Sequence, residues 1–151
     1  MENRLRLDIN RKFGKSGNKE YYGKDAHTIV FNMQEKIIRK KALESDCIFV
    51  GRCADAVLAK EKGVEVLNIF VSAPLNERIN RIMKVNHLNM KDAVIKIKKM
   101  DKKRELYYKY FAKKDWGKSS EYDLTINSAR WGQETCIKMI QGIYEQMEWN
   151  K

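Results

Sequence analysis

Apolar residues along this chain switch between helical spacing and short continuous runs, a pattern typical of α/β proteins. The first helical stretch is Thr28–Ser45, where apolar residues recur every three or four positions beside a polar face. Asp25, His27 or Thr28 is predicted to cap its start, because short polar side chains accept the unpaired amides of a first turn.

Two short apolar runs predict buried strands. Cys47–Val50 is rich in β-branched and aromatic residues, and Gly51 ends it before a short helix within Ala54–Lys60. Val64–Val71 is nearly continuous in apolar residues. Near-continuous apolar strands separated by helices predict a parallel sheet that is covered on both faces.

The segment after the second strand predicts two helices. Ser72 is expected to cap the first, which carries Pro74 in its first turn, where a missing amide costs little. Asn89 is expected to start a long basic helix, with Asp92 as the second member of a capping-box arrangement.

This long helix carries one charged residue, Arg104, on its apolar stripe, and Asp101 and Tyr108 share its face. An exposed basic helix with an internal Asp–Arg pair fits the pattern. A mobile lid whose cations neutralise transferring phosphates fits it as well, and composition does not choose between them.

The C-terminal part predicts one more strand and one more helix. Tyr122–Asn127 alternates into a polar end, and a helix of roughly 132–147 follows, capped by Asn127 or Ser128. The order of elements predicts a parallel α/β domain with a helical excursion before the last strand.

The charge is strongly basic: 31 Lys and Arg against 20 Asp and Glu give a formal net charge of +11. Such an excess favours phosphorylated or polyanionic partners, nucleotides and nucleic acid alike. No stretch approaches the roughly 18 to 20 apolar residues of a membrane span, and no signal peptide opens the chain, so no membrane partner is expected.

The three cysteines are Cys47, Cys53 and Cys136, and they lack metal-ligand spacing. Cys47 and Cys136 lie in apolar patterns, which predicts buried thiols in a reducing environment. We therefore expect a cytoplasmic protein.

Arg52 leaves the predicted Cys47–Val50 strand beside Gly51. Ligands of open parallel sheets bind at the carboxyl ends of the strands, where a guanidinium can hold an anion through two hydrogen bonds. A surface salt bridge explains the same residue equally well, so the pattern leaves both interpretations open.

The first 26 residues are polar and basic, and we predict a poorly structured segment ahead of one domain over 27–151. Phe13–Glu20 contains Gly-Lys-Ser but lacks the earlier glycine of the phosphate-loop pattern G-x-x-x-x-G-K-[ST]. Leu5–Ile9 before it is a weak strand, so a flexible surface loop is the favoured interpretation.

Three blocks of sequence carry a family resemblance: Phe49–Asp55, Phe70–Arg78, and the run Met100–Asn127 with its D-x-x-R-x-x-Y-Y, D-W-G and Y-D-L-x-I-N motifs. Through them the chain resembles the cytidylate kinase-like family of P-loop nucleoside monophosphate kinases, from about Thr28 onward. The resemblance implies a three-layer P-loop fold with a helical lid at about 89–114. It also implies Mg²⁺-dependent transfer of a phosphoryl group from ATP to CMP or a related nucleotide.

The resemblance also implies roles for individual residues. Arg104 and Asp101 match the lid block, where an arginine neutralises the phosphoryl group in flight, and Arg52 matches the G-R motif near the acceptor nucleotide. No metal ligand is assigned. The further substrate-binding residues that it implies are Asp55, Arg78, Tyr108, Asp123, Asn127 and Arg130.

One part of the family pattern, a buried strand with a glycine-rich phosphate loop, is missing or degenerate. Phe13–Gly17 echoes the family's F-G-x-G-G, but it lies close to the Cys47 strand. We expect the unit to lie upstream of Met1 or to have been lost, which would remove the amides that cradle ATP and leave an inactive relative as an alternative. A sheet without its central strand would expose an apolar edge, which predicts a homo-oligomer.

The basic helix supports a second function class. Residues 91–114 interleave lysines with aromatic residues, which suits phosphate binding and base stacking in single-stranded nucleic acid. A non-catalytic nucleotide- or nucleic-acid-binding module is therefore the alternative hypothesis, behind the kinase.

Overall fold

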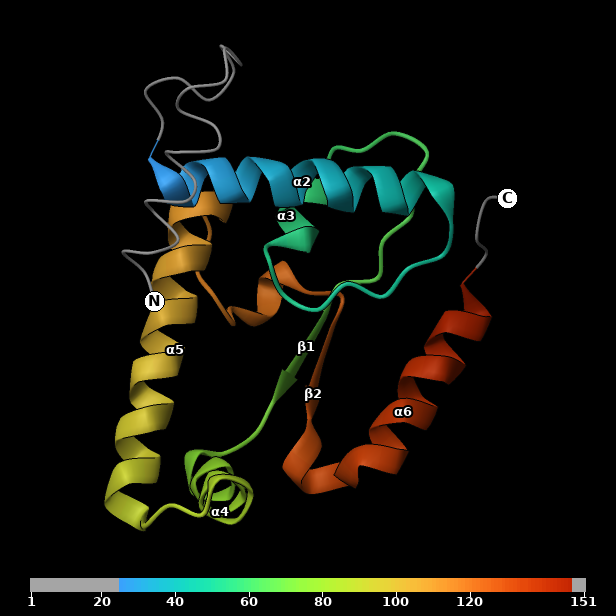
Figure 1. Ribbon diagram of the computed structural model, residues 1–151. Coiled ribbons are helices and arrows are strands. Elements are labelled where there is room, and N and C mark those ends of the chain that lie inside the picture. Colours follow the sequence, from blue (N-terminus) through green and yellow to red (C-terminus); the bar gives the residue numbers. More distant parts are fainter. Residues whose placement is uncertain (1–24, 148–151) are drawn as a thin grey trace. The chain divides into compact units, whose positions relative to one another are not determined.

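The computed structural model describes residues 25–147, and the chain divides into two compact units, Met1–Val64 and Glu65–Lys151. The first unit contains helices α2 (Ala26–Glu44) and α3 (Ala54–Leu58) (Figure 1). None of the described helices is long and apolar enough to cross a membrane. The second unit contains β1 (Ile69–Ser72), α4 (Leu75–Asn86), α5 (Met90–Ala112), the 3₁₀ turn η2 (Ser119–Glu121), β2 (Leu124–Asn127) and α6 (Ser128–Gln146).

The first unit is built on the predicted helix α2, which packs against α3. Asp25 is its N-cap: one carboxylate oxygen accepts from the amides of His27 (2.9 Å) and Thr28 (3.1 Å), as the sequence predicted. Ile29 and Ile38 of α2 are buried, and α3 buries Ala54, Val57 and Leu58.

The predicted strand Cys47–Val50 does not form. This segment is irregular and exposed, with Ile48 95% and Val50 88% accessible to solvent. Cys47 is exposed, so the predicted buried thiol is wrong at this position, whereas Cys53 and Cys136 are buried. An apolar run becomes a strand only beside a partner that completes its hydrogen-bond ladder, and the described part of the first unit contains no other strand.

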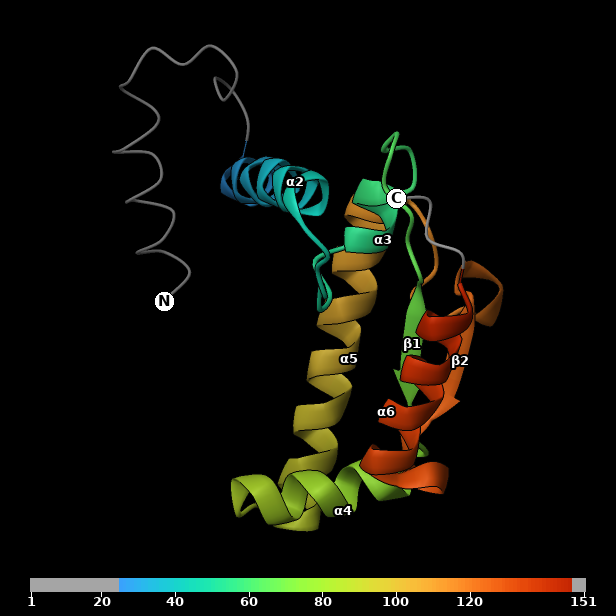
Figure 2. The ribbon, with the colours of Figure 1, turned by 90° about the vertical axis from the view of Figure 1, so that its right-hand side faces the viewer.

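The second unit contains a two-stranded parallel sheet in which Ile69 pairs with Leu124 and Ser72 with Asn127. Figure 1 shows α5 and α6 on opposite sides of the strand pair, and Figure 2 shows α4 running across the end of β1. Parallel strands connected through helices confirm the predicted α/β class, as a small parallel sheet with mostly helices.

The strand predicted at Val64–Val71 is shorter than expected. Its first five residues are irregular, and β1 is half-buried rather than buried. Ser72 belongs to β1 and donates its hydroxyl to the carbonyl of Ile126 (3.2 Å), so the predicted helix cap is wrong. Pro74 is the N-cap of α4 instead, without a side-chain hydrogen bond to the first turn.

The caps predicted for the remaining two helices are confirmed. Asn89 caps α5 by accepting the amide of Asp92 (2.9 Å), and its own side-chain amide donates to the Asp92 carboxylate (2.8 Å). Asn127 caps α6 through the amides of Ala129 and Arg130, both at 3.2 Å. This helix bends at Gly132 (φ 74°, ψ 165°), the position at which the sequence predicted it to start.

Candidate functional site

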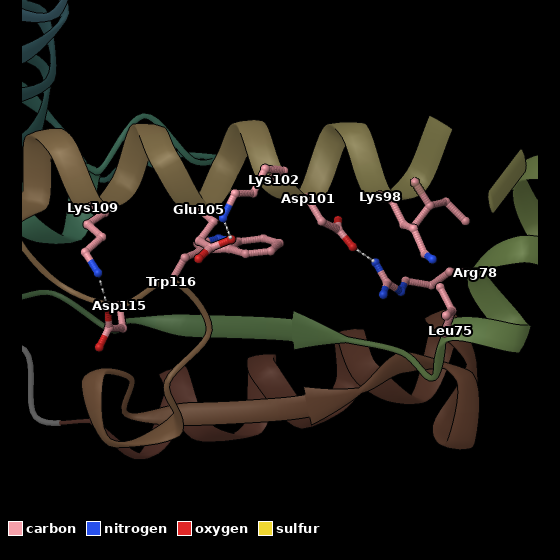
Figure 3. Close-up of a pocket in the computed structure, with 10 residues that line it drawn as sticks. Leu75, Arg78, Lys98, Asp101, Lys102, Glu105, Lys109, Asp115 and Trp116 are labelled. Atoms are coloured by element: carbon pink, nitrogen blue, oxygen red, sulfur yellow. Dashed lines mark hydrogen bonds and ion pairs between the residues drawn. The ribbon is translucent and has the colours of Figure 1, made fainter. Parts of the chain in front are cut away.

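A groove of about 520 Å³ lies between α4, α5 and the loop that carries Trp116 (Figure 3). Its apolar lining comes from Leu75, Ile97 and Trp116, and the rest of its wall is charged. Because all three segments belong to the second unit, this groove is a feature of that unit alone.

One carboxylate in the groove holds two arginines. Arg78 of α4 contacts one oxygen of Asp101 at 2.5 Å, and Arg104 contacts the other oxygen at 3.3 Å. The Asp101 side chain is 25% exposed, against 36% for Arg78 and 55% for Arg104. Two guanidinium groups on one carboxylate leave a net positive charge, and each guanidinium keeps N–H groups that can bind an anion.

Arg78 is more buried than a solvated helix arginine. Its Nε has no hydrogen-bond partner among the described residues, although it is shielded from solvent. Arginine side chains on a helix surface are usually solvated. The structure instead places Arg78 on the groove wall, next to the lid residues that the family resemblance singled out.

The charges of the groove are largely paired, with one exception. Lys102 pairs with Glu105 (3.1 Å), and Lys109 pairs with Asp115 (3.8 Å). Lys98 has no ion-pair partner in the part of the chain that the structure describes, and it extends toward the same end of the groove as Arg78 (Figure 3). Lys98 and Arg78 therefore make this end the electropositive one.

The D-W-G motif forms the far wall of the groove. Trp116 packs edge-on against Phe70 of β1, with ring centroids 5.6 Å apart, and the guanidinium of Arg104 lies 5.9 Å from the indole. Gly117 has a φ of +78°, and an added Cβ would lie 3.0 Å from the Phe70 ring. A glycine is thus needed both for the turn and for the close approach to the strand.

A further ion pair fixes the other end of this loop. Lys114, just after α5, contacts the Glu121 carboxylate at 2.8 Å. The hydrogen bond from Lys114 lowers the pKa of Glu121. The residues Asp115–Gly117 are therefore held between α5 and η2.

The other predicted site residues of the second unit lie away from the groove wall. The Asp123 carboxylate accepts the amide of Asn68 (2.7 Å) ahead of β1, Asn127 caps α6, and Tyr108 is buried. Arg130 is exposed and lies 6.0 Å from the Trp131 ring. Asp123 and Asn127 each make a contact that stabilises the fold. Their roles in substrate binding stay predictions.

Arg52 and Asp55 belong to the first unit. Gly51, Arg52 and Cys53 all have positive φ angles (71°, 59° and 56°), forming a left-handed turn before α3. Arg52 is exposed, and it forms no ion pair with another described residue. Asp55 lies half-buried in the first turn of α3. Both stay predictions as acceptor-binding residues.

Lys98 and Trp116 are among the groove residues that were not predicted as functional. Lys98 is one of many lysines on a basic helix, so nothing in the sequence distinguishes it from its neighbours. Trp116 carried a usable signal, because D-W-G was one of the motifs that supported the family resemblance.

The arginine and lysine side chains at the groove provide cations that suit phosphate groups. Within 25–147, no group of three or more His, Cys, Asp or Glu side chains could hold a metal ion. Mg²⁺ in kinases is commonly held by one or two carboxylates together with the phosphates of the nucleotide. The candidate phosphate loop at Phe13–Gly17 lies outside the described residues.

Two cytidylate kinases are similar to this chain. That of Methanopyrus kandleri is 29% identical over 115 residues, which cover 72% of this chain and 60% of the relative. That of Thermococcus kodakarensis is 26% identical over 106 residues, covering 70% of this chain and 53% of the relative. The chain therefore spans between half and two thirds of the length of these relatives.

The fold also has a solved counterpart. A crystal structure of an uncharacterized protein from Eubacterium ventriosum matches with a TM-score of 0.74 at 24% sequence identity. The match covers 96% of this chain and 91% of that chain, so the similarity concerns the whole fold.

A family match covers most of the sequence. The cytidylate kinase-like family matches residues 4–130, which include all three blocks that carried the resemblance. It begins ahead of Thr28, where the motifs placed the start of the resemblance, and so takes in Phe13–Gly17. With both the motifs and the family match in agreement, this chain belongs to the cytidylate kinase-like family.

Proposed function

We propose that this chain is a phosphotransferase of the nucleoside monophosphate kinase type, which moves a phosphoryl group from ATP to CMP or a related nucleotide. The observation that carries the proposal is the pair of arginines on Asp101 beside the electropositive end of the groove. The similarity to two cytidylate kinases supports the substrate class. The proposed architecture is a three-layer P-loop fold, of which β1 and β2 are two strands.

In this proposal the chain stabilises the charge of the transferring group and forms no covalent bond to the substrate. The bond from the γ-phosphorus to the bridging oxygen of ATP breaks, and a bond to a phosphate oxygen of the acceptor forms. The transferring group carries its charge on three equatorial oxygens, so catalysis rests on positioned cations. Arg104 is the residue assigned to these oxygens, and Lys98 and Arg78 are assigned to the flanking phosphates.

Asp101 acts as a positioning residue in this scheme. Both of its oxygens are engaged by guanidinium groups, so it orients Arg78 and Arg104 and is not assigned as a base. Trp116 supports Arg104 from the other side through a cation–π contact. Mg²⁺ would neutralise charge between the phosphates when it is bound with the nucleotide.

The remaining assignments follow the family resemblance. Arg52 and Asp55 are proposed to bind the acceptor nucleotide, and Tyr108, Asp123, Asn127 and Arg130 to shape its site. The donor side needs a phosphate loop, for which Phe13–Gly17 is the candidate in this sequence. If this segment does not cradle ATP, the chain binds the acceptor without turnover.

Calorimetric titration with CMP and with ATP tests the proposal, followed by a coupled assay for nucleoside diphosphate. We expect Arg104→Met to weaken nucleotide binding by roughly 10- to 150-fold, because this is the usual effect of losing a hydrogen bond to a charged group. Arg81→Met is the matched control, because it makes the same change at an exposed residue of α4 that contacts neither Asp101 nor Trp116.

Three outcomes separate the alternatives. Binding with turnover supports the kinase, and binding without turnover supports the inactive relative. If neither nucleotide binds, or if the two variants weaken binding equally, the groove is not the phosphate site and the proposal fails.

A further inference from the structure

The charged residues of α5 are divided between two faces of the helix. The groove face carries both acidic residues that follow the first turn, Asp101 and Glu105, and each of them is ion-paired. The opposite face carries Lys96, Lys99 and Lys103, spaced three and four residues apart and all exposed. Residues at this spacing lie in one row along a helix.

The three lysines of this row, which we call the outer row, are not neutralised. No ion pair links Lys96, Lys99 or Lys103 to another described residue. Asp92 lies one turn before Lys96, but its carboxylate accepts the side-chain amide of Asn89 instead. Like charges three and four residues apart destabilise a helix by about 0.2–0.5 kcal/mol per pair, a cost that an anionic partner would remove.

An exposed aromatic residue continues the outer row. Tyr110 lies seven residues beyond Lys103, two helical turns along the same face, and is 56% exposed. Lys113 places its ammonium group 5.0 Å from the centre of the Tyr110 ring. From Lys96 to Tyr110 the row extends about 21 Å, at about 1.5 Å per residue.

We propose that this outer row binds single-stranded nucleic acid, with the lysines on successive phosphates and Tyr110 stacked on a base. Basic residues that follow the backbone and aromatic rings that stack on unpaired bases are the two elements of non-specific single-strand binding. A duplex keeps its bases stacked inside, so an exposed tyrosine favours the single strand. The proposal does not rest on the kinase function, because it uses no residue of the groove.

An anionic membrane fits this face less well. A helix that lies on a membrane separates its lysines from a continuous apolar face that enters the lipid. Here the exposed Ile95 (54%) and Leu106 (55%) border the lysines on the same side. The opposite side of α5 is committed to the groove and the core, where Ala93 and Ile97 are buried.

Fluorescence anisotropy with labelled oligouridylate and oligothymidylate of about 20 nucleotides tests the proposal. The logarithm of the association constant should fall linearly with the logarithm of the salt concentration, with a slope of about −0.7 for each phosphate contacted. The triple variant Lys96→Gln, Lys99→Gln, Lys103→Gln should therefore bind more weakly and lower the magnitude of the slope by about 2. Tyr110→Ala should weaken binding roughly 5- to 150-fold, as the loss of one base stack does.

The matched control removes the same charge elsewhere, in the variant Lys40→Gln, Lys62→Gln, Lys138→Gln, whose three lysines are exposed. Equal loss of affinity in the two triple variants would show a net-charge effect and overturn the proposal. So would the absence of oligonucleotide binding at low salt, or binding to phosphatidylserine vesicles without binding to oligonucleotides. If the outer-row triple variant loses helix content, Lys99→Gln alone should still lower the slope by about 0.7.

Discussion

Arg78 on α4 and Asp101 on α5 form an ion pair at 2.5 Å that joins the two helices of the groove. The pair is only partly shielded from solvent, so its contribution to stability is limited. Its larger effect is geometric, because Asp101 holds Arg104 through its second oxygen. One contact between helices therefore sets the positions of two cations.

A double-mutant cycle measures this contact. Arg78→Gln, Asp101→Asn and the double variant should show a coupling of about 0.5–1 kcal/mol in urea unfolding, as expected for a partly exposed pair. In the same variants, the free energy of nucleotide binding should decrease by more than the free energy of unfolding, because the arginines lose their orientation. Nucleotide affinity that only follows the loss of stability would contradict a positioning role for Asp101.

A second prediction concerns Cys47–Val50, the exposed segment before α3. Ile48→Ala should change the free energy of unfolding by less than about 0.5 kcal/mol, because Ile48 is 95% exposed. Leu58→Ala, at a position that is 4% exposed, should cost about 2–5 kcal/mol. A cost above about 2 kcal/mol for Ile48→Ala would mean that this segment is a buried strand after all.

The sequence predicted helix positions well, because the signals are local. Asp25, Asn89 and Asn127 cap the helices that they were expected to cap, each through amides two or three residues away. Strands depend on partners that are distant in sequence. Cys47–Val50 and Val64–Val71 have similar apolar runs, yet β1 forms only where Ile69–Ser72 meets β2.

The difference between local and long-range contacts also decides which site residues could be predicted. Asp101 and Arg104 share a helical face and were predicted as a pair from their spacing. The contact of Arg78 with Asp101 spans 23 residues, so no local pattern shows it, and Lys98 looks like every other lysine of α5. Family motifs supplied what spacing could not, since they singled out Arg78 and the loop of Trp116.

Gly117 offers a test of how the groove wall is built. Gly117→Ala combines a φ of +78° with a Cβ only 3.0 Å from the Phe70 ring, so it should destabilise by more than the roughly 1–2 kcal/mol of the left-handed conformation alone. Gly63→Ala has a φ of +79° with no atom within 4 Å and should cost only the conformational part. Equal costs in thermal unfolding would mean that Phe70 moves away freely.

The N-cap of α2 should make the helix sensitive to acid. The hydrogen bond from the Thr28 hydroxyl, followed by the Thr28 amide, lowers the pKa of Asp25. A lowered pKa means that the cap stabilises fully above the unfolded value of about 3.9 and is lost as the pH falls through the folded value. NMR should show a carboxyl titration below that value and, in acid, a loss of protection of the Thr28 amide relative to its intrinsic exchange rate. Asp25→Asn keeps an accepting oxygen and should remove this pH dependence.

The fluorescence of Trp116 should report on ligand binding in the groove. Its indole lines the groove and lies 5.9 Å from the Arg104 guanidinium, so a phosphate that binds Arg104 changes the charge next to the ring. Saturation with ATP, whose γ-phosphate is assigned to Arg104, should therefore change tryptophan fluorescence, and Trp116→Phe should abolish the change while the other tryptophans remain. Trp131→Phe is the matched control, because Trp131 lies on α6 beside Arg130 and does not line the groove. A signal that survives Trp116→Phe but disappears in Trp131→Phe would place the nucleotide near α6 and away from the arginine pair.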